Sequence, residues 1–449
     1  MDNKEIGIMK NLGKYWNLSV SAGLGSMLGS GIIVGLASTI TVWQMGLNLT
    51  NGQVGVISGA LTFAIAFGSI FGSRFADKVG IVTIFDWVNF LYAIGAGICV
   101  FSNGYLMLLA GVVICGVASG TDLPVSLTVI SRDAPNQKLA SQMVASTQIF
   151  WQVGQFVSTG AAFVVSTMSV TGGRIVFGFF ALVALVLWVW RTFTKGIRVL
   201  HKEAAERLAA KEAELDENPT KKASVIQVLF RSSRSKIYIR LFAAIAIYYI
   251  FWNFVANTFG QFTTFMFVKA GASQTLSTGI GLGLHIAALF ILGFYVTIAG
   301  SAKRNTWFTL GVIFALIAMG GLAVFGATSI ALIVAFMLVW GVGSMLSGEA
   351  IYKVWTQESF PDEIRATIQG FINGVSRFLC GILAMFTPLL VLPTTIKATM
   401  WGFVGIVIVF GLAGFAMIHY EKKYNMINGD EASKEAAAKA AGDATTPSN

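Results

Sequence analysis

Charged residues are scarce in this chain of 449 residues. Asp, Glu, Lys and Arg together make up 12% of the sequence, which is about half of their share in soluble domains. Hydrophobic residues make up 55%. Proline is also rare, with 7 residues against 49 glycines, a balance that suits closely packed membrane helices. The composition therefore excludes an ordinary soluble domain.

Cysteine and metal-binding patterns are equally sparse. Cys99, Cys115 and Cys380 all fall inside apolar segments, without the spacing of a disulfide framework or a metal site. No cluster of His, Cys and Glu has metal-ligand spacing. No Gly-rich loop ends in Gly-Lys-Ser or Gly-Lys-Thr, as nucleotide-driven pumping would require. We therefore expect no metal, no cofactor and no enzymatic activity.

Long apolar segments dominate the sequence instead, six before and six after a hydrophilic stretch from Arg191 to Arg240. A helix needs roughly 20 apolar residues to cross a bilayer. Six spans on each side of a hydrophilic centre are typical of secondary transporters. We therefore predict an all-α polytopic membrane protein with twelve transmembrane helices in two six-helix bundles. The predicted spans are 18–43, 53–73, 82–103, 105–131, 140–166, 175–195, 241–267, 275–299, 306–326, 329–357, 366–391 and 398–420.

These spans divide the chain into four parts. Residues 1–195 are predicted to form the N-terminal bundle, 196–240 a charged and partly helical linker, 241–421 the C-terminal bundle and 422–449 a disordered tail. The linker contains a stretch rich in Ala, Glu, Lys and Arg, which favours a solvated surface helix.

Basic residues separate the loops into two sets. One set, with the N-terminal segment, the linker and the tail, holds most of the lysines and arginines. The other holds only Arg174, Lys269 and Lys397. The positive-inside rule therefore places both termini and the linker in the cytoplasm, in a bacterial inner membrane. Membrane topology thus explains the net charge of +10, and we expect no nucleic-acid partner. The first residues lack the apolar region and cleavage site of a signal peptide, so no removable leader is expected.

Polar side chains interrupt the seventh span in a regular row. Asn253, Asn257 and Gln261 recur every four residues and therefore share one helix face. Polar groups inside a span usually face the bundle interior or a wet cavity. Amides both donate and accept hydrogen bonds, which suits a ligand rich in hydroxyl groups. The alternative is hydrogen bonding that holds neighbouring helices together.

The fifth span repeats the pattern with Gln148, Gln152 and Gln155. The indole of Trp151 lies close to the same face. Stacking of this indole on a sugar ring and packing against a neighbouring helix are both open, and the amide row itself could again be structural.

Four of the ionisable residues within predicted spans are candidates for proton coupling, charge switching or substrate binding. Asp122 is the main candidate for proton coupling, because a carboxylate inside a span can take up and release a proton; a static ion pair is the alternative. Glu349 and Lys353 are spaced for an intrahelical salt bridge, which is either merely tolerated or switches partners during transport. Arg377, which follows Asn373 by one turn, needs an anion: either Asp122 or Glu349, or an acidic group on the substrate.

The loop after the second span, Gly72-Ser73-Arg74-Phe75-Ala76-Asp77-Lys78-Val79-Gly80, resembles the signature of the major facilitator superfamily. In that superfamily a Gly-rich turn carries an acid–base pair at the cytoplasmic hinge. The match is partial, because Ser73 and Ile81 stand where a second glycine and a base are usual. The resemblance implies a latch that stabilises one conformation. The residues predicted to take part in gating are Arg74, Asp77, Arg132, Glu358 and Arg365.

Further stretches are similar to the sugar-porter branch of that superfamily. The resemblance places Gln148 and Asn257 at sugar-contacting positions, and Glu358-Ser-Phe-Pro-Asp-Glu-Ile-Arg365 is close to its tenth-loop motif. The chain also departs from the pattern. Gly31 occupies the place of an aspartate linked to proton coupling, and Trp252 stands where a second sugar-contacting glutamine is usual.

We therefore predict an outlying, sugar-porter-like carrier of a sugar or polyol that works by alternating access with proton symport. An organic-anion or sugar-acid symporter that uses Arg377 and Lys353, an uncoupled facilitator and a non-transporting solute sensor are the alternatives. The expected partners are a small-molecule substrate, protons and the lipid bilayer, and the protein is expected to be a monomer. The predicted substrate-binding residues are Gln148, Trp151, Gln152, Trp252, Asn253, Asn257, Gln261, Asn373 and Arg377.

Overall fold

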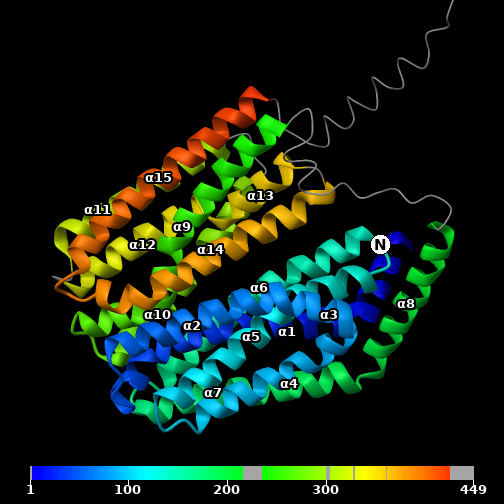
Figure 1. The fold of residues 1–449 in the computed structure, drawn as a ribbon, viewed down its shortest axis with the longest axis horizontal. Coiled ribbons are helices and arrows are strands. Elements are labelled where there is room, and N and C mark those ends of the chain that lie inside the picture. The colour runs from blue at the N-terminus through cyan, green and yellow to red at the C-terminus, as the bar shows by residue number, and fades with distance from the viewer. Residues whose placement is uncertain (1–2, 216–234, 300–303, 327–328, 361, 425–449) are drawn as a thin grey trace, which may run out of the picture.

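The computed structural model describes residues 3–215, 235–299, 304–326, 329–360 and 362–424. Within these ranges the regular secondary structure is helical and includes no strand, which confirms the predicted all-α fold. Figure 1 shows the helices gathered into two groups. The N-terminal group comprises α1 (Asn3–Gly46), α2 (Asn51–Phe67), the π-helical turn η1 (Gly68–Gly72), α3 (Ser73–Val79), α4 (Ile81–Val100), α5 (Tyr105–Asp133), α6 (Gln137–Val164) and α7 (Ser169–Phe193). The C-terminal group comprises α9 (Ser235–Lys269), α10 (Gln274–Ala299), α11 (Arg304–Phe325), α12 (Ile330–Leu346), α13 (Glu349–Ser359), α14 (Asp362–Leu390) and α15 (Ile396–Lys423).

Each predicted span falls on a helix of the structure. Ten segments of the described chain are long and apolar enough to cross a membrane. The predicted spans at α6 and α10 are not among them. In α6 the glutamines and several hydroxyl residues lower the apolar content, and in α10 the side chains beyond residue 291 lie outside the described part. The count of twelve spans stays a prediction for these two helices.

The tenth predicted span, 329–357, is broken into two helices. The sequence suggested one continuous helix, but α12 ends at Leu346 and α13 begins at Glu349. Gly348, at the break, has φ −112° and ψ −144°, which are not helical values. The hydroxyl of Tyr248 in α9 donates to the carbonyl oxygens of Ser347 and Gly348. Because the buried carbonyl groups freed by the break are hydrogen-bonded, the interruption is tolerated inside the bundle.

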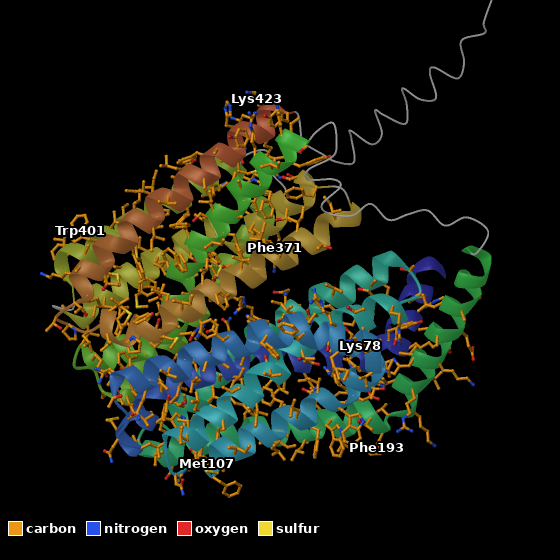
Figure 2. All side chains as sticks on the ribbon, viewed as in Figure 1. Lys78, Met107, Phe193, Phe371, Trp401 and Lys423 are labelled. Atoms are coloured by element: carbon orange, nitrogen blue, oxygen red, sulfur yellow. The ribbon has the colours of Figure 1, made fainter. Side chains whose placement is uncertain are left out.

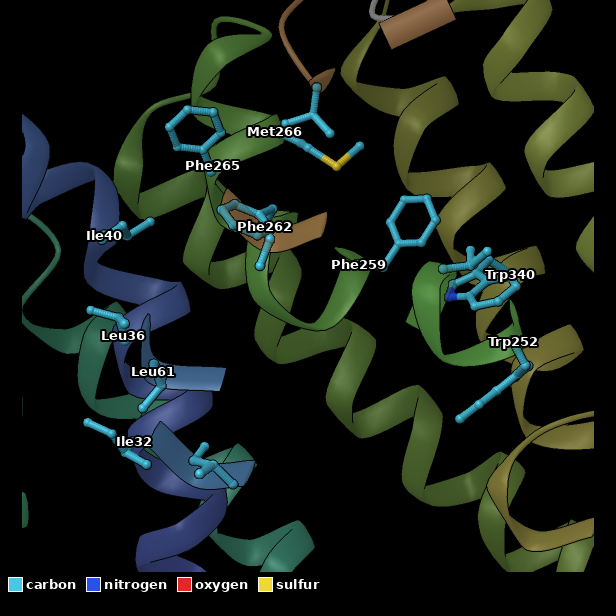
Figure 3. Close-up of a cluster of buried hydrophobic side chains, with 14 of the residues drawn as sticks. Ile32, Leu36, Ile40, Leu61, Trp252, Phe259, Phe262, Phe265, Met266 and Trp340 are labelled. Atoms are coloured by element: carbon cyan, nitrogen blue, oxygen red, sulfur yellow. The ribbon is translucent and has the colours of Figure 1, made fainter. Parts of the chain in front are cut away.

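Apolar faces of α1, α2 and α9 form one continuous core across the two groups. Ile32, Leu36 and Ile40 follow one another at helical spacing on α1 and are at most 2% exposed. Figure 3 shows this row beside Leu61 of α2, and the apolar side chains of α9 beyond it. The labelled members from α9 are Trp252, Phe259, Phe262, Phe265 and Met266.

The two groups are joined by polar contacts at one end of the molecule. We call this the distal end; it carries the turns at residues 47–50, 270–273 and 391–395. The hydroxyl groups of Ser166 and Thr275 lie 2.8 Å apart. Gln274 accepts from the hydroxyl of Thr41 (2.5 Å) and donates to the carbonyl oxygen of Ser38 (2.8 Å). The opposite end, where α7 ends and α9 begins, is called the terminal end.

Close packing of α2 on α14 reinforces the distal contact. A Cβ on Gly55 would overlap the carbonyl oxygen of Met385, and one on Gly59 would lie 2.9 Å from that of Gly381. Glycine at these positions therefore lets the two backbones touch. Figure 1 shows the two groups diverging from this contact towards α3 and α13, at the terminal end.

The linker begins with α8 (Lys195–Leu215), which is held against the N-terminal group. His201 Nδ1 lies 2.5 Å from Asp133 Oδ2, and Arg207 donates to the carbonyl oxygens of Arg132 and Asp133. The sequence predicted a solvated helix in this stretch. The solvated face is present, but polar contacts fix the inner face of α8 to the end of α5.

Candidate functional site

The amide row of α9 lies on one face of the helix, as predicted, and its three members have different partners. Asn253 Nδ2 donates to Ser376 Oγ of α14 at 2.8 Å. Gln261 Nε2 donates to Thr62 Oγ1 of α2 and to Asn257 Oδ1, both at 2.9 Å. Gln261 therefore links the two groups of helices.

Asn257 is the member of this row with hydrogen-bonding capacity left over. Its Oδ1 accepts from Gln261, but its Nδ2 is buried and has no hydrogen-bond partner among the described residues. Because an unsatisfied buried donor is costly, a native protein usually provides a partner from water or a ligand. Asn257 can thus donate to a hydroxyl group placed between the two groups.

Aromatic side chains stack one helical turn from this row. Tyr249 of α9 and Tyr352 of α13 are stacked with ring centroids 3.8 Å apart, and Trp252 is stacked on Tyr249 at 5.9 Å. The indole of Trp252 lies over Gly348 at the break between α12 and α13. Its buried Nε1 has no partner in the described part of the chain. The three rings are at most 7% exposed, so they form a buried stack that packs α9 against α13.

The break after α12 brings two charged residues to the surface of the C-terminal group. Glu349 begins α13, and its carboxylate lies 3.0 Å from Lys353 Nζ. The intrahelical pair predicted from their spacing is therefore present. The side chains are 47% and 38% exposed, so the pair is more accessible than its position in an apolar run suggests.

Arg377 of α14 lies near enough to Glu349 for their charges to interact. It is half-buried, yet within the described residues it makes no salt bridge and no hydrogen bond. Asn373, one turn earlier, is also half-buried. The sequence left open a pairing of Arg377 with Asp122; this is wrong, because Asp122 pairs with another arginine.

That arginine is Arg191, near the end of α7. Arg191 Nη1 lies 2.5 Å from Asp122 Oδ1, and the side chains are 0% and 5% exposed. Arg191 also donates to the carbonyl oxygens of Ser21 and Phe85. A Cβ at Gly25 would overlap the pair, so glycine leaves room for it against α1. Sequence reasoning placed Arg191 at the end of the sixth predicted span, where the hydrophilic stretch begins, and did not recognise it as a buried partner.

The residues predicted on α6 lie on its surface towards the C-terminal group. Gln148 is exposed, and Gln152 is half-buried. Their row continues at helical spacing to Thr159, whose methyl group faces Gly281 of α10. The indole of Trp151 instead contacts Gly29 of α1. Gln148 and Gln152 are therefore accessible to a ligand, whereas Trp151 is partly occupied in packing.

Two of the five predicted gating residues, Glu358 and Arg132, form pairs within their own group of helices. Glu358 accepts two hydrogen bonds from Arg304, at 2.7 and 2.6 Å, and Arg304 also pairs with Glu421. Arg132 lies 2.7 Å from Asp133. Arg74 is exposed at the start of α3. The side chains of Asp77 and Arg365 lie outside the described residues.

Several partners of these residues were missed by sequence reasoning. Arg304 and Glu421 lie at helix ends and His201 lies in the charged helix α8, and in both settings a charged residue is equally compatible with solvent. The turn before α4, by contrast, belongs to the motif recognised in the sequence. Its Gly80 has φ 111°, a value that favours glycine.

Comparison with known proteins supplies the wider context. Residues 18–385 match the Major Facilitator Superfamily. The minor myo-inositol transporter IolF of Bacillus subtilis (strain 168) is 25% identical over 383 residues, covering 83% of this chain and 84% of the relative. A putative metabolite transport protein of Haemophilus influenzae is 24% identical and covers 80% of this chain and 86% of its own length. A solved D-xylose–proton symporter superposes with a TM-score of 0.71 at 16% identity, over 88% of this chain and 96% of that structure.

Proposed function

Since the chain belongs to the Major Facilitator Superfamily and is a multi-pass membrane transporter, we propose that it carries a cyclic polyol or sugar by alternating access. In this proposal both termini lie in the cytoplasm of a bacterial cell, as the distribution of basic residues indicates. The distal end is then external, and the conformation is one in which the external side is closed. The substrate binds between the two groups of helices.

The unsatisfied donor on Asn257 is the observation that carries the substrate assignment. The amides of Gln148 and Gln152 and the indole N–H of Trp252 add donors and acceptors to the facing surfaces. Neutral amides suit hydroxyl groups, which both donate and accept. The buried stack of Tyr249, Tyr352 and Trp252 lies beside the amide row of α9 and packs α9 against α13. Similarity to a myo-inositol transporter agrees with this substrate class.

Proton symport is the coupling mode that we propose. Glu349 is half-exposed at the break after α12 and is paired with Lys353. Protonation of Glu349 would release Lys353 and change the charge of the surface that faces the substrate. Asp122 is the second candidate. Proton uptake by Asp122 would have to break its buried bond to Arg191. Coupling to transport would then act through the packing of α5 on α7.

An organic anion is the alternative substrate, and one observation favours it. Arg377 has no counter-ion within hydrogen-bond distance among the described residues, and an arginine in a partly buried position ordinarily has one. A substrate carboxylate would supply this partner, and Lys353 would add a second positive charge.

Stabilisation by ligands separates the two substrate classes. We expect myo-inositol to raise the unfolding temperature of the purified protein, because a ligand present at 100 times its Kd adds about 2.7 kcal/mol to the free energy of unfolding. Glucuronate at the same concentration is expected to have little effect. Stabilisation by glucuronate alone, abolished by Arg377→Gln, would instead assign an organic-anion carrier.

A further inference from the structure

A second cleft lies on the N-terminal group, between η1–α3 on one side and α4 on the other. Its volume is about 660 Å³. Phe67, Phe71 and Phe75 form one wall, Trp87 and Leu91 form the other, and the floor is contributed by α5. Most of the lining is apolar. The cleft lies outside the proposed substrate site.

The cleft opens away from the C-terminal group. The face of α2 and η1 that meets α14 carries Phe63, whose ring lies 5.2 Å from that of Phe378, and Ile70, which approaches Gly374. The cleft-lining residues lie on another face of the same helical segment. Phe67, Phe71 and Trp87 are 55%, 49% and 49% exposed. In a membrane protein such side chains contact lipid.

Aromatic residues indicate the depth of the cleft in the bilayer. On the outer surface of α4 and α7, the indole of Trp188 lies 5.3 Å from that of Trp87 and 4.7 Å from the ring of Phe90. Aromatic clusters of this kind are typical of the membrane–water interface. Figure 2 shows Lys78 and Phe193 towards the terminal end, whereas Met107 lies at the distal end.

Two cations lie at the mouth of the apolar cleft. Arg74 and Lys78 are spaced one helical turn apart on α3, and both line the cleft. Both are exposed, and neither forms an ion pair with any side chain that the structure describes. Basic residues beside an apolar surface at this depth attract anionic lipid headgroups.

We propose that this cleft binds one anionic phospholipid of the surrounding membrane. The phosphate group lies between Arg74 and Lys78, and an acyl chain occupies the apolar cleft along Phe71 and Trp87. The lipid then contacts η1 directly. A π-helical turn inside a longer helix is frequently found at a functional site. In this protein the π-helical turn η1 packs on α5 through Gly68 and Gly72, where any larger side chain would overlap the backbone or side chains of α5.

Native mass spectrometry of the purified full-length protein in detergent tests this site. Phosphatidylglycerol and phosphatidylcholine with identical acyl chains are the probes. We expect the protein to retain one phosphatidylglycerol in preference to phosphatidylcholine. In the Arg74→Gln/Lys78→Gln variant its affinity should fall by roughly tenfold or more, because each basic group near a membrane surface contributes to anionic-lipid binding.

Two matched variants separate the cleft from general charge attraction. Lys422→Gln/Lys423→Gln removes two exposed cations from the same end of the C-terminal group, and its affinity for phosphatidylglycerol should change less than about twofold. Leu91→Trp narrows the cleft without altering charge and should also weaken binding. The proposal is overturned if phosphatidylcholine binds equally well, if the two double variants have equal effects, if Leu91→Trp binds normally, or if soluble glycerol 3-phosphate displaces the lipid.

Discussion

Asp122→Asn is expected to lower the free energy of unfolding by about 3–5 kcal/mol, because it leaves the buried guanidinium of Arg191 without a counter-ion. The pair is 2.5 Å apart, and both side chains are almost inaccessible to solvent. Four helices meet around it, since Arg191 on α7 also bonds to carbonyl groups of α1 and α4. We therefore expect poor membrane yield and a lowered unfolding temperature for the purified variant.

Two comparisons make this expectation specific. Glu203→Gln breaks the exposed pair with Lys14 and should leave the unfolding temperature almost unchanged, because solvent screens the attraction between exposed charges. The double variant Asp122→Leu/Arg191→Met removes both charges and should recover much of the lost stability, because apolar replacement of a buried ion pair is often neutral. If Asp122→Asn unfolds like the wild type and loses only proton-driven accumulation, the pair is a coupling device and its structural role is minor.

Asn257→Ala is expected to weaken polyol binding by roughly ten- to a hundredfold, since the loss of a donor aimed at a substrate hydroxyl leaves that group unsatisfied in the bound state. The same change removes the acceptor for Gln261, which keeps its second bond to Thr62. Folding should therefore be nearly unaffected. Calorimetric titration with myo-inositol measures the change in Kd.

A matched amide variant controls for nonspecific effects. Asn103 lies on the exposed turn before α5, and Asn103→Ala should bind myo-inositol with wild-type affinity. Equal affinity in Asn257→Ala and the wild type would mean that the amide row only holds helices together. If glucuronate binding survives in Asn257→Ala and is lost in Arg377→Gln, the substrate-binding site lies at α14 instead.

Local composition explains which features the sequence revealed. Long apolar segments predict where helices cross a membrane, because the requirement is one of length and hydropathy. The four-residue spacing of Asn253, Asn257 and Gln261 predicts a shared face, because residues four positions apart lie on the same side of a helix. The spacing of Glu349 and Lys353 likewise predicts their salt bridge.

Features that depend on packing between distant segments were not predictable. Arg191 follows an apolar run and precedes basic residues, so its sequence environment is that of a linker; only the approach of α5 and α1 makes it a buried partner of Asp122. The break at Gly348 depends on Tyr248, 100 positions earlier, which satisfies the freed carbonyl group. A single glycine in an apolar run is common in membrane helices and gives no such indication.

The central claim is tested most directly by measuring exchange of labelled myo-inositol by the protein in liposomes, with a reducible disulfide that holds the distal end closed. The hydroxyl groups of Ser166 and Thr275 are 2.8 Å apart, so cysteines at these two positions can form a disulfide that joins the turn after α6 to α10. Alternating access requires this contact to open in every cycle. We predict rapid exchange by the wild type and the reduced Ser166→Cys/Thr275→Cys variant, none by the oxidised variant, and recovery on reduction. Exchange that continues with the disulfide intact, or no exchange of polyol by the folded wild type, would contradict the account.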